Sequence, residues 1–319
     1  MRIIKLLTLT FTLVVLQSIS GANPKVNEFQ VTGYVNASWI KPQTDLEFIQ
    51  YVDRIFYFGM SPDSEGRFVV TDNYIENYKI VRSKMNNNQK ILLVVGGGAK
   101  VANMHVMGND SEKREAYVKE LVAFAKKHKF DGIDMDWETD WKAQPKMEVP
   151  VDNLIALLTS IKKQMPKNSM LTAALGGSSV EHAVAIEPLV DDLSLMLYSS
   201  LTKDGLHAPL SYVKDRVKGF DRAGYPKSKL LVGVPFYARG PEKKTILYRD
   251  IADNLTPGDT ITEMYKGCSF NSIKIMRDKV KFMKEAGYKG IMIWELTQDA
   301  PYAHPMSLLR AIYNEAKKE

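Results

Sequence analysis

The feature that most constrains the fold is a repeated alternation between short, β-rich apolar runs and amphipathic segments with helical spacing. Eight such runs follow one another along the 319-residue chain. Strands that alternate with helices pair in parallel, and eight of them predict a closed (β/α)8 barrel. No repeat, low-complexity tract or linker divides the chain, so we expect an α/β fold with a single domain. The predicted strands are Phe29–Val35, Val52–Phe58, Lys90–Val95, Phe130–Asp136, Met170–Leu175, Leu193–Tyr198, Lys229–Phe236 and Gly290–Trp294.

Five of the intervening segments carry the helical pattern clearly. In each of them apolar residues recur every three or four positions, with charged residues between them. Gly224 and Gly287 stand just beyond two of these segments and are typical helix-ending residues. The predicted helices cover residues 111–129, 154–165, 212–220, 273–286 and 306–316.

The fourth predicted strand differs from the others because one of its faces is acidic. Its alternation sets three carboxylates against three apolar side chains, namely Asp134, Asp136 and Glu138 against Ile133, Met135 and Trp137. Three crowded carboxylates repel each other and lose hydration, so this face is not an ordinary core face. Active sites of such barrels lie at the carboxyl ends of the strands, where Asp136 and Glu138 fall. Asp131 is out of phase and is interpreted as a structural start to the strand.

The N-terminus has the layout of a secretory signal peptide. A short basic start over residues 1–5 is followed by an apolar run over residues 6–16 and then by small residues. We expect cleavage near residues 20–22, which gives a signal peptide over 1–22 and a secreted or periplasmic protein. The run is too short for a comfortable membrane span, and no other stretch reaches about 18 apolar residues. No cysteine lies near the cleavage region, so lipid attachment is not indicated.

Composition and charge argue against several other classes. The formal net charge is +6, but the lysines are interleaved with acidic residues and form no basic stripe, so we expect no nucleic-acid partner. Cys268 is the only cysteine, which excludes an intramolecular disulfide. The five histidines show no metal-ligand spacing, so the sequence predicts no metal and no cofactor. A cation site made of carboxylate oxygens alone stays open as an alternative for the acidic strand.

The acidic strand also carries a family resemblance. Asp131–Glu138 matches without interruption the DxxDxDxE signature, and the chain resembles glycoside hydrolase family 18, the chitinase family. The resemblance covers roughly residues 30–315 and implies a (β/α)8 catalytic domain over residues 23–319. Further matches follow in the family's order: Lys90–Gly97 resembles the third-strand SxGG region, Met196–Tyr198 the sixth-strand MxY, Leu231–Arg239 the seventh-strand segment and Gly290–Glu295 the eighth.

The resemblance implies a role for each matched residue. Glu138 would protonate the glycosidic oxygen and then activate water. Asp136 would hold and polarise the substrate's N-acetyl group, and Asp134 would lie behind it and tune its charge. Tyr198 would donate a hydrogen bond near the acetamido carbonyl, and Trp294 would form the floor under the sugar. Further residues expected to line the substrate pocket are Tyr34, Arg239 and, because it follows the acidic strand, Trp141.

The reaction that the resemblance implies is hydrolysis of β-1,4-linked N-acetylglucosamine with retention of configuration. The substrate's own acetamido group would replace the enzyme nucleophile. Cleavage also needs a carboxylic acid that stays protonated near neutral pH, and Asp136 beside Glu138 favours this. The expected partner is an N-acetylglucosamine oligo- or polysaccharide, and we expect a monomer. Two alternatives stay open: an endo-β-N-acetylglucosaminidase that acts on the chitobiose core of N-glycans, and a non-catalytic chitinase-like carbohydrate-binding protein.

Two residues depart from the family pattern. Val94 stands where the family has serine before its paired glycines, and Ser199 stands where aspartate often follows the MxY tyrosine. Both changes bear on the electrostatics of the site and not on its class. The stretch between Tyr237 and Trp294 is too short for the sizeable α+β insertion of many members. We therefore expect a short form with an open groove.

Overall fold

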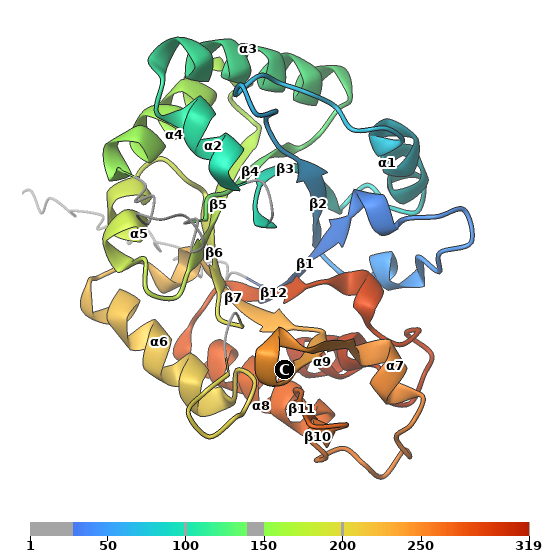
Figure 1. Cartoon of the computed structure of the whole chain (residues 1–319). Helices are drawn as coiled ribbons and strands as arrows, with labels where there is room; N and C mark the ends of the chain where they lie inside the picture. The colour runs from blue at the N-terminus through green and yellow to red at the C-terminus, as the bar shows by residue number, and fades with distance from the viewer. Residues whose placement is uncertain (1–27, 99–100, 139–149, 199–200, 319) are drawn as a thin grey trace, which may run out of the picture.

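A computed structural model describes residues 28–98, 101–138, 150–198 and 201–318. Eight parallel strands form a closed barrel in the order β1-β12-β7-β6-β5-β4-β3-β2, and helices surround it (Figure 1). The predicted single-domain (β/α)8 barrel is confirmed. The predicted signal peptide, residues 1–22, lies outside the described residues. The barrel strands are β1 (Gln30–Asn36), β2 (Arg54–Met60), β3 (Lys90–Gly96), β4 (Gly132–Asp136), β5 (Met170–Gly176), β6 (Asp192–Met196), β7 (Leu230–Pro235) and β12 (Gly290–Trp294).

Local capping signals explain where the helices begin and end. The Asp110 side chain accepts hydrogen bonds from two backbone N–H groups in the first turn of α3, and Gly287 ends α8 in a left-handed conformation with φ of 80°. The helices around the barrel are α1 (Tyr74–Ser83), α2 (Val101–Gly108), α3 (Ser111–Lys127), α4 (Val151–Gln164), α5 (Val180–Ile186), α6 (Leu210–Arg222), α8 (Ile273–Ala286) and α9 (Leu308–Ala316). Within the described residues, no helix is both long enough and apolar enough to cross a membrane.

Two strand boundaries, at the start of β2 and the end of β6, differ from the prediction by two residues. Strand β2 begins at Arg54, two residues later than predicted, and just before it the Asp53 side chain accepts a hydrogen bond from the Val31 N–H at 2.7 Å. Strand β6 ends at Met196, because the Leu197 N–H bonds back to the Leu195 carbonyl at 3.0 Å in a tight turn. Tyr198 therefore lies just beyond its strand and not within it.

The alternation along β4 separates two hydrophobic clusters. Ile133 and Met135 are fully buried in the outer cluster, among residues of the surrounding helices, as predicted. The inner cluster fills the barrel and includes Tyr34, Val94 and Tyr198. The acidic face of β4 thus points into the barrel, where the inner cluster forms its apolar surroundings.

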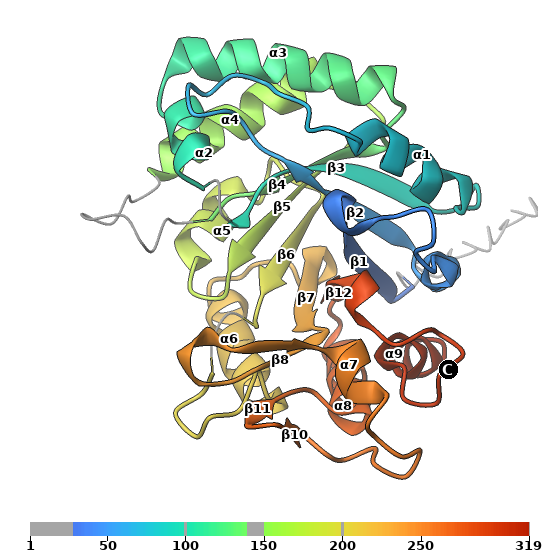
Figure 2. The same ribbon diagram turned by 45° about the vertical axis from the view of Figure 1, so that its right-hand side comes forward.

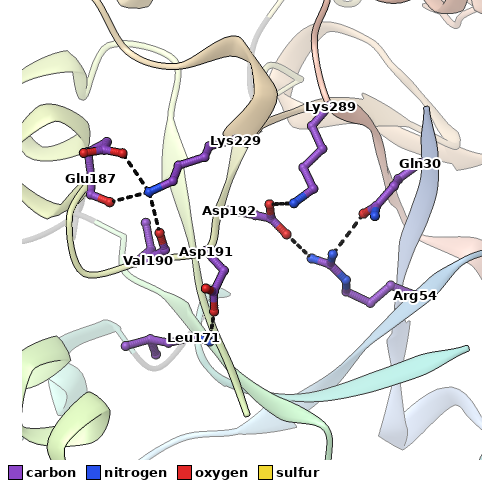
Figure 3. A network of polar contacts seen from close by, with 9 residues as sticks. All are labelled: Gln30, Arg54, Leu171, Glu187, Val190, Asp191, Asp192, Lys229 and Lys289. Carbon is purple, nitrogen blue, oxygen red and sulfur yellow. Dashed lines mark hydrogen bonds and ion pairs between the residues drawn. The ribbon is translucent and has the colours of Figure 1, made fainter. Parts of the chain in front are cut away.

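A buried ionic network closes the amino end of the barrel (Figure 3). Asp192 at the start of β6 pairs with Arg54 at the start of β2 at 2.6 Å, and Lys289 bonds to its other carboxylate oxygen. Arg54 also donates to the Gln30 side chain at 2.9 Å. The Arg54 and Asp192 side chains are 4% and 0% exposed, and their strands lie on opposite sides of the ring. Since this end is tied across by ion pairs, the opposite, carboxyl end is left for the site.

A small antiparallel sheet is inserted between β7 and α8 and lies beside the barrel (Figure 2). Its two-residue and three-residue strands are too short to show periodicity in the sequence. The insertion also holds a short helix, α7 (Tyr248–Ala252). In spatial order the sheet consists of β10 (Met264–Tyr265), β11 (Cys268–Ser269), β8 (Tyr237–Arg239) and β9 (Thr245–Leu247).

Candidate active site

Strand β4 carries three carboxylates from the barrel interior to its mouth. Asp134 is fully buried, Asp136 at the strand's last position is 3% exposed, and Glu138 beyond the strand is partly exposed. The sequence prediction that these acids share one face is confirmed. Asp131, predicted to be structural, accepts a hydrogen bond from the Ile91 N–H at 2.9 Å and so joins the starts of β3 and β4.

Asp134 is held by two hydroxyl groups inside the barrel. Tyr34 donates to one carboxylate oxygen at 2.7 Å, and Thr172 on β5 donates to the other at 2.5 Å. Burial raises the pKa of Asp134 to about 6, while the two hydrogen bonds and the positive charge of Arg54 act against that rise. Tyr34 was predicted to line the substrate pocket, and its 1% exposed side chain lies against Asp134.

Asp136 is the most perturbed carboxyl group of the cluster. Its Oδ1 atom is buried and has no hydrogen-bond partner among the described residues. Burial raises its pKa well above the usual range, and the negative charges of Glu138 and Asp134 raise it further. Asp136 therefore keeps its proton to a higher pH than an ordinary aspartate does.

The glycines after β3 allow the backbone to approach these carboxylates closely. The Gly97 N–H donates to the backbone carbonyl of Asp136 at 2.9 Å, and the Gly98 N–H donates to Oε1 of Glu138 at 2.8 Å. Gly97 has φ of 73°, and a Cβ atom there would lie 2.3 Å from Oδ2 of Asp136. A side chain at this position would displace the carboxylate, so glycine is required.

Tyr198 enters the same site from the end of β6. Its side chain is 6% exposed, and its hydroxyl lies 3.8 Å from the sulfur of Met292. Gly233 leaves room for the ring, because a Cβ atom there would lie 2.8 Å from Cε1 of Tyr198. Burial raises the pKa of Tyr198 well above its usual value, and the charge of Asp136 adds to the rise. The hydroxyl therefore stays protonated and can donate a hydrogen bond.

Trp294 ends β12 and forms an aromatic wall beside the carboxylates. Its ring centroid lies 5.4 Å from that of Tyr34 and 5.1 Å from that of Phe58, with the latter pair edge to face. The Trp294–Glu295 peptide bond is cis. Glu295 is buried and accepts hydrogen bonds from the backbone N–H of Asn36 at 3.0 Å and from Thr297. These contacts join the ends of β1 and β12 and fix the backbone beside the tryptophan.

Two further predicted site residues are Arg239 and Trp141, and the structure describes only the first. Arg239 lies on β8 of the small sheet, opposite Ser269, and its charge lowers the pKa of Tyr237, which burial raises. Trp141 and the departure at Ser199 fall outside the described residues.

A cavity of about 750 Å³ lies among the loops after β1 and β12 and helix α7. Trp39, which is 43% exposed, and Arg249 contribute to its wall. Its described lining does not include Asp134, Asp136 or Glu138, so it is distinct from the carboxylate site.

Two residues that contact this site were missed from the sequence. Thr172 belongs to an apolar strand, and the sequence does not reveal which residue of β4 it faces. The sequence indicates only a surface or packing role for His207, whereas its ring contacts the backbone carbonyl of Tyr198 at 2.8 Å. Neither residue belongs to a local motif, so only the folded arrangement identifies them.

Relatives with known names share this chain's sequence pattern. An endochitinase of Brugia malayi is 26% identical over 73% of this chain and 59% of its own length. Chitinase A1 of Niallia circulans is 26% identical over 73% of this chain and 38% of its own length. The chain thus spans less than two thirds of either relative.

Solved structures and a family model agree with the fold. The GH18 chitinase ChiB of Flavobacterium johnsoniae superimposes with a TM-score of 0.76 at 25% identity, covering 91% of this chain and 94% of that one. A chitinase of Bacteroides thetaiotaomicron gives a TM-score of 0.77 at 22% identity, covering 91% and 97%. The model of glycosyl hydrolases family 18 matches residues 30–299, which include every barrel strand and all three carboxylates. The chain therefore belongs to glycosyl hydrolases family 18.

Proposed function

We propose that this protein is a secreted glycoside hydrolase that cleaves β-1,4-linked N-acetylglucosamine in chitin or chito-oligosaccharides with retention of configuration. The observation that carries the proposal is the Oδ1 atom of Asp136, a buried acceptor without a hydrogen-bond partner among the described residues. Leaving such a group unpaired is unfavourable by about 1–3 kcal/mol. The N–H of a 2-acetamido group supplies the missing donor.

In the first step, Glu138 donates its proton to the glycosidic oxygen as the bond from that oxygen to C1 breaks. The acetamido carbonyl oxygen of the same sugar attacks C1, which forms an oxazolinium ion and releases the other sugar as an alcohol. Asp136 accepts a hydrogen bond from the acetamido N–H and stabilises the positive charge. Tyr198 donates its hydroxyl hydrogen near the acetamido carbonyl and so orients it for attack.

In the second step, the Glu138 carboxylate removes a proton from a water molecule as the water oxygen attacks C1. The bond between C1 and the acetamido oxygen breaks, and the acetamido group is restored. Two inversions at C1 give net retention of configuration. Glu138 ends the cycle protonated, as it began.

The electrostatics of the site support this assignment. The raised pKa of Asp136 means that this carboxyl group, beside Glu138, holds a proton at a pH where an ordinary aspartate has lost it. When the acetamido N–H binds Asp136, this proton can pass to Glu138, which then donates it in the first step. The positive charge that develops on the acetamido group during the first step favours the ionised form of Asp136.

The relatives support the enzyme over a non-catalytic binding protein. They include endochitinases and also human chitinase-3-like protein 2, which is 25% identical over 70% of this chain. The presence of Glu138, with a hydrogen bond from the Gly98 N–H that orients it, favours the enzyme. Secretion is proposed from the layout of residues 1–22.

The test compares the wild-type protein with Glu138→Gln on tetra-N-acetylchitotetraose and on a high-mannose glycoprotein, with products identified by mass. Removing the general acid should lower kcat by about 10²–10⁴-fold and leave oligosaccharide binding intact. Glu285→Gln, at an exposed position on α8, is the control and should hydrolyse normally. The anomer released first, observed by NMR, should be β.

Three results would overturn the proposal. Unchanged turnover in Glu138→Gln would remove the acid from the mechanism. Initial release of the α-anomer would exclude retention. Cleavage of the glycoprotein alone, between its two core N-acetylglucosamine residues, would assign the barrel to N-glycans instead of chitin.

A further inference from the structure

A chain of buried polar residues leads from helix α8 to the backbone of Tyr198. The Lys279 ammonium group on α8 donates to Oδ1 of Asn271, and Nδ2 of Asn271 donates to the backbone carbonyl of His207 at 2.6 Å. All three residues are at most 1% exposed. Polar groups this deeply buried are unfavourable unless they are paired, so the chain holds each member in a fixed position.

The His207 ring lies between two backbone carbonyl groups. Its Nε2 atom is 2.8 Å from the Tyr198 carbonyl oxygen, and its Nδ1 atom is 3.2 Å from the Tyr237 carbonyl oxygen. Burial lowers the pKa of His207 to about 4, so the ring is neutral near pH 7 and carries a single N–H. We assign that hydrogen to Nε2, because its contact is the shorter of the two, so that Nε2 donates to the Tyr198 carbonyl.

The same carbonyl oxygen accepts a second hydrogen bond from the Tyr237 hydroxyl at 3.0 Å. The small sheet thus contributes through β8, and also through β11, where the Ser269 hydroxyl accepts from the His207 backbone N–H at 3.0 Å. We refer to His207 and Tyr237, with their two bonds to Tyr198, as the carbonyl clamp.

Tyr198 needs such a clamp because the barrel ladder does not reach it. Strand β6 ends at Met196, and its register with β7 ends at Leu195 paired with Val232. Beyond that point no sheet pairing fixes the backbone of Tyr198 among the described residues. The position of the Tyr198 hydroxyl, on which the charges of Asp136 and Glu138 act, then depends in part on what holds the Tyr198 carbonyl.

We infer that His207 is a positioning residue that sets the Tyr198 hydroxyl against the substrate's acetamido group through the Nε2 hydrogen bond to the Tyr198 carbonyl. This inference rests on the proposed function. His207 does not touch the reacting atoms and acts only through Tyr198. Its contribution is geometric: it fixes a group that must meet the acetamido carbonyl at the moment of attack.

Two amide substitutions separate the two ring nitrogens of His207. In His207→Gln the side-chain NH₂ can occupy the place of Nε2 and keep the bond to Tyr198. In His207→Asn the NH₂ falls near the place of Nδ1, and that bond is lost. On tetra-N-acetylchitotetraose we expect His207→Asn to lose about 10- to 100-fold in kcat with little change in KM, and His207→Gln to stay within a few-fold of wild type. Equal losses in the two variants would overturn the inference.

A double-mutant cycle with Tyr198→Phe tests whether His207 acts through Tyr198. Because the clamp works by placing the hydroxyl, His207→Asn should cause little further loss of kcat once that hydroxyl is gone. Fully additive losses would contradict the inference and indicate a general structural role. Melting temperatures of all variants accompany the kinetics, so that a folding defect is recognised.

Crystal structures of the two amide variants provide a readout that needs no turnover. Tyr198 should shift in His207→Asn and stay in place in His207→Gln, and an unmoved Tyr198 in both would overturn the clamp. Wild-type protein that hydrolyses no N-acetylglucosamine substrate would refute the proposed function instead. The crystal comparison still decides the clamp in that case, so the two failures are distinguishable.

Discussion

Thr172 donates a 2.5 Å hydrogen bond to the buried carboxylate of Asp134 across the β4–β5 ladder. On the other side of Asp134, its register partner on β3 is Val94, where the family pattern has serine. A hydroxyl group expected on one neighbouring strand is therefore found on the other. Thr172 offsets the effect that the valine was expected to have on the electrostatics of the site.

We predict that Thr172→Val both destabilises the protein and changes its pH dependence. Loss of a hydrogen bond to a buried charged group should lower the free energy of unfolding by about 1.5–3 kcal/mol. This hydrogen bond lowers the pKa of Asp134, so its removal raises that pKa, and the acidic limb of the kcat profile should move to higher pH. Urea unfolding measures the change in stability, and kcat measured between about pH 4 and 8 shows the change in pH dependence.

A second substitution tests whether it matters from which neighbouring strand a hydroxyl group reaches Asp134. Val94→Ser in the Thr172→Val background restores a hydroxyl beside Asp134 from β3 and should recover part of both losses. Thr172→Ser, which keeps the original hydroxyl, serves as the matched control and should behave like wild type. The interpretation would be wrong if Val94→Ser left the pH profile of the Thr172→Val protein unchanged.

Gly97→Ala should impair catalysis more than it impairs folding. The added Cβ atom would lie 2.3 Å from Oδ2 of Asp136, so that carboxylate must move away from the acetamido group. We expect a loss of about 10²-fold in kcat, together with about 1–2 kcal/mol of destabilisation from the left-handed backbone. Steady-state kinetics and urea unfolding measure the two separately.

Gly224→Ala is the control for backbone strain. Gly224 has φ of 75°, and a Cβ atom there would meet no heavy atom within 4 Å. The Gly224→Ala variant should lose about as much stability as Gly97→Ala does and keep its full kcat. Comparable losses of kcat in the Gly97 and Gly224 variants would show that strain, and not displacement of Asp136, lowers the activity.

Glu295 should make the free energy of unfolding depend on pH near neutrality. Burial raises its pKa from 4.5 to about 7, against the opposing effect of its hydrogen bonds to Thr297 and Asn36. A raised carboxyl pKa contributes stability that is present in full below the unfolded pKa and is lost as the pH rises through the folded pKa. From pH 5 to 8, wild type should therefore lose up to about 3 kcal/mol relative to Glu295→Gln.

The comparison between these two proteins isolates Glu295, because other buried groups contribute equally to both. Burial lowers the pKa of His207 and of Lys279, which shifts stability in the opposite direction over neighbouring pH ranges. Chemical unfolding at several pH values gives the difference directly. A difference that stays constant from pH 5 to 8 would mean that Glu295 ionises normally in the folded protein.

The acidic strand shows how much of the site can be predicted from neighbouring residues in the sequence. The period of a β-strand places Asp134, Asp136 and Glu138 on one face without any knowledge of the other strands. The eight alternating runs likewise predict the barrel, because each strand and helix has its own local pattern. These inferences need only neighbours in the chain, which explains their success.

Contacts between strands depend on register and packing and not on the local sequence alone. That Thr172 faces Asp134 depends on the register of β5 against β4, and a shift of two residues would give the same apolar pattern. His207 reaches Tyr198 only because the loop between β6 and α6 folds back over the end of β6. Such tertiary contacts are set by the packing of the whole barrel, so a single sequence does not reveal them.

The small sheet beside the barrel has a consequence for redesign of the enzyme. Shortening this insertion is one way to change access to the barrel for bulky or branched glycans. However, β8 carries Tyr237 and β11 carries Ser269, and both belong to the hydrogen bonds that hold His207 and Tyr198. Loop length here is thus coupled to turnover, and a chimera with a shorter insertion must bring its own support for Tyr198.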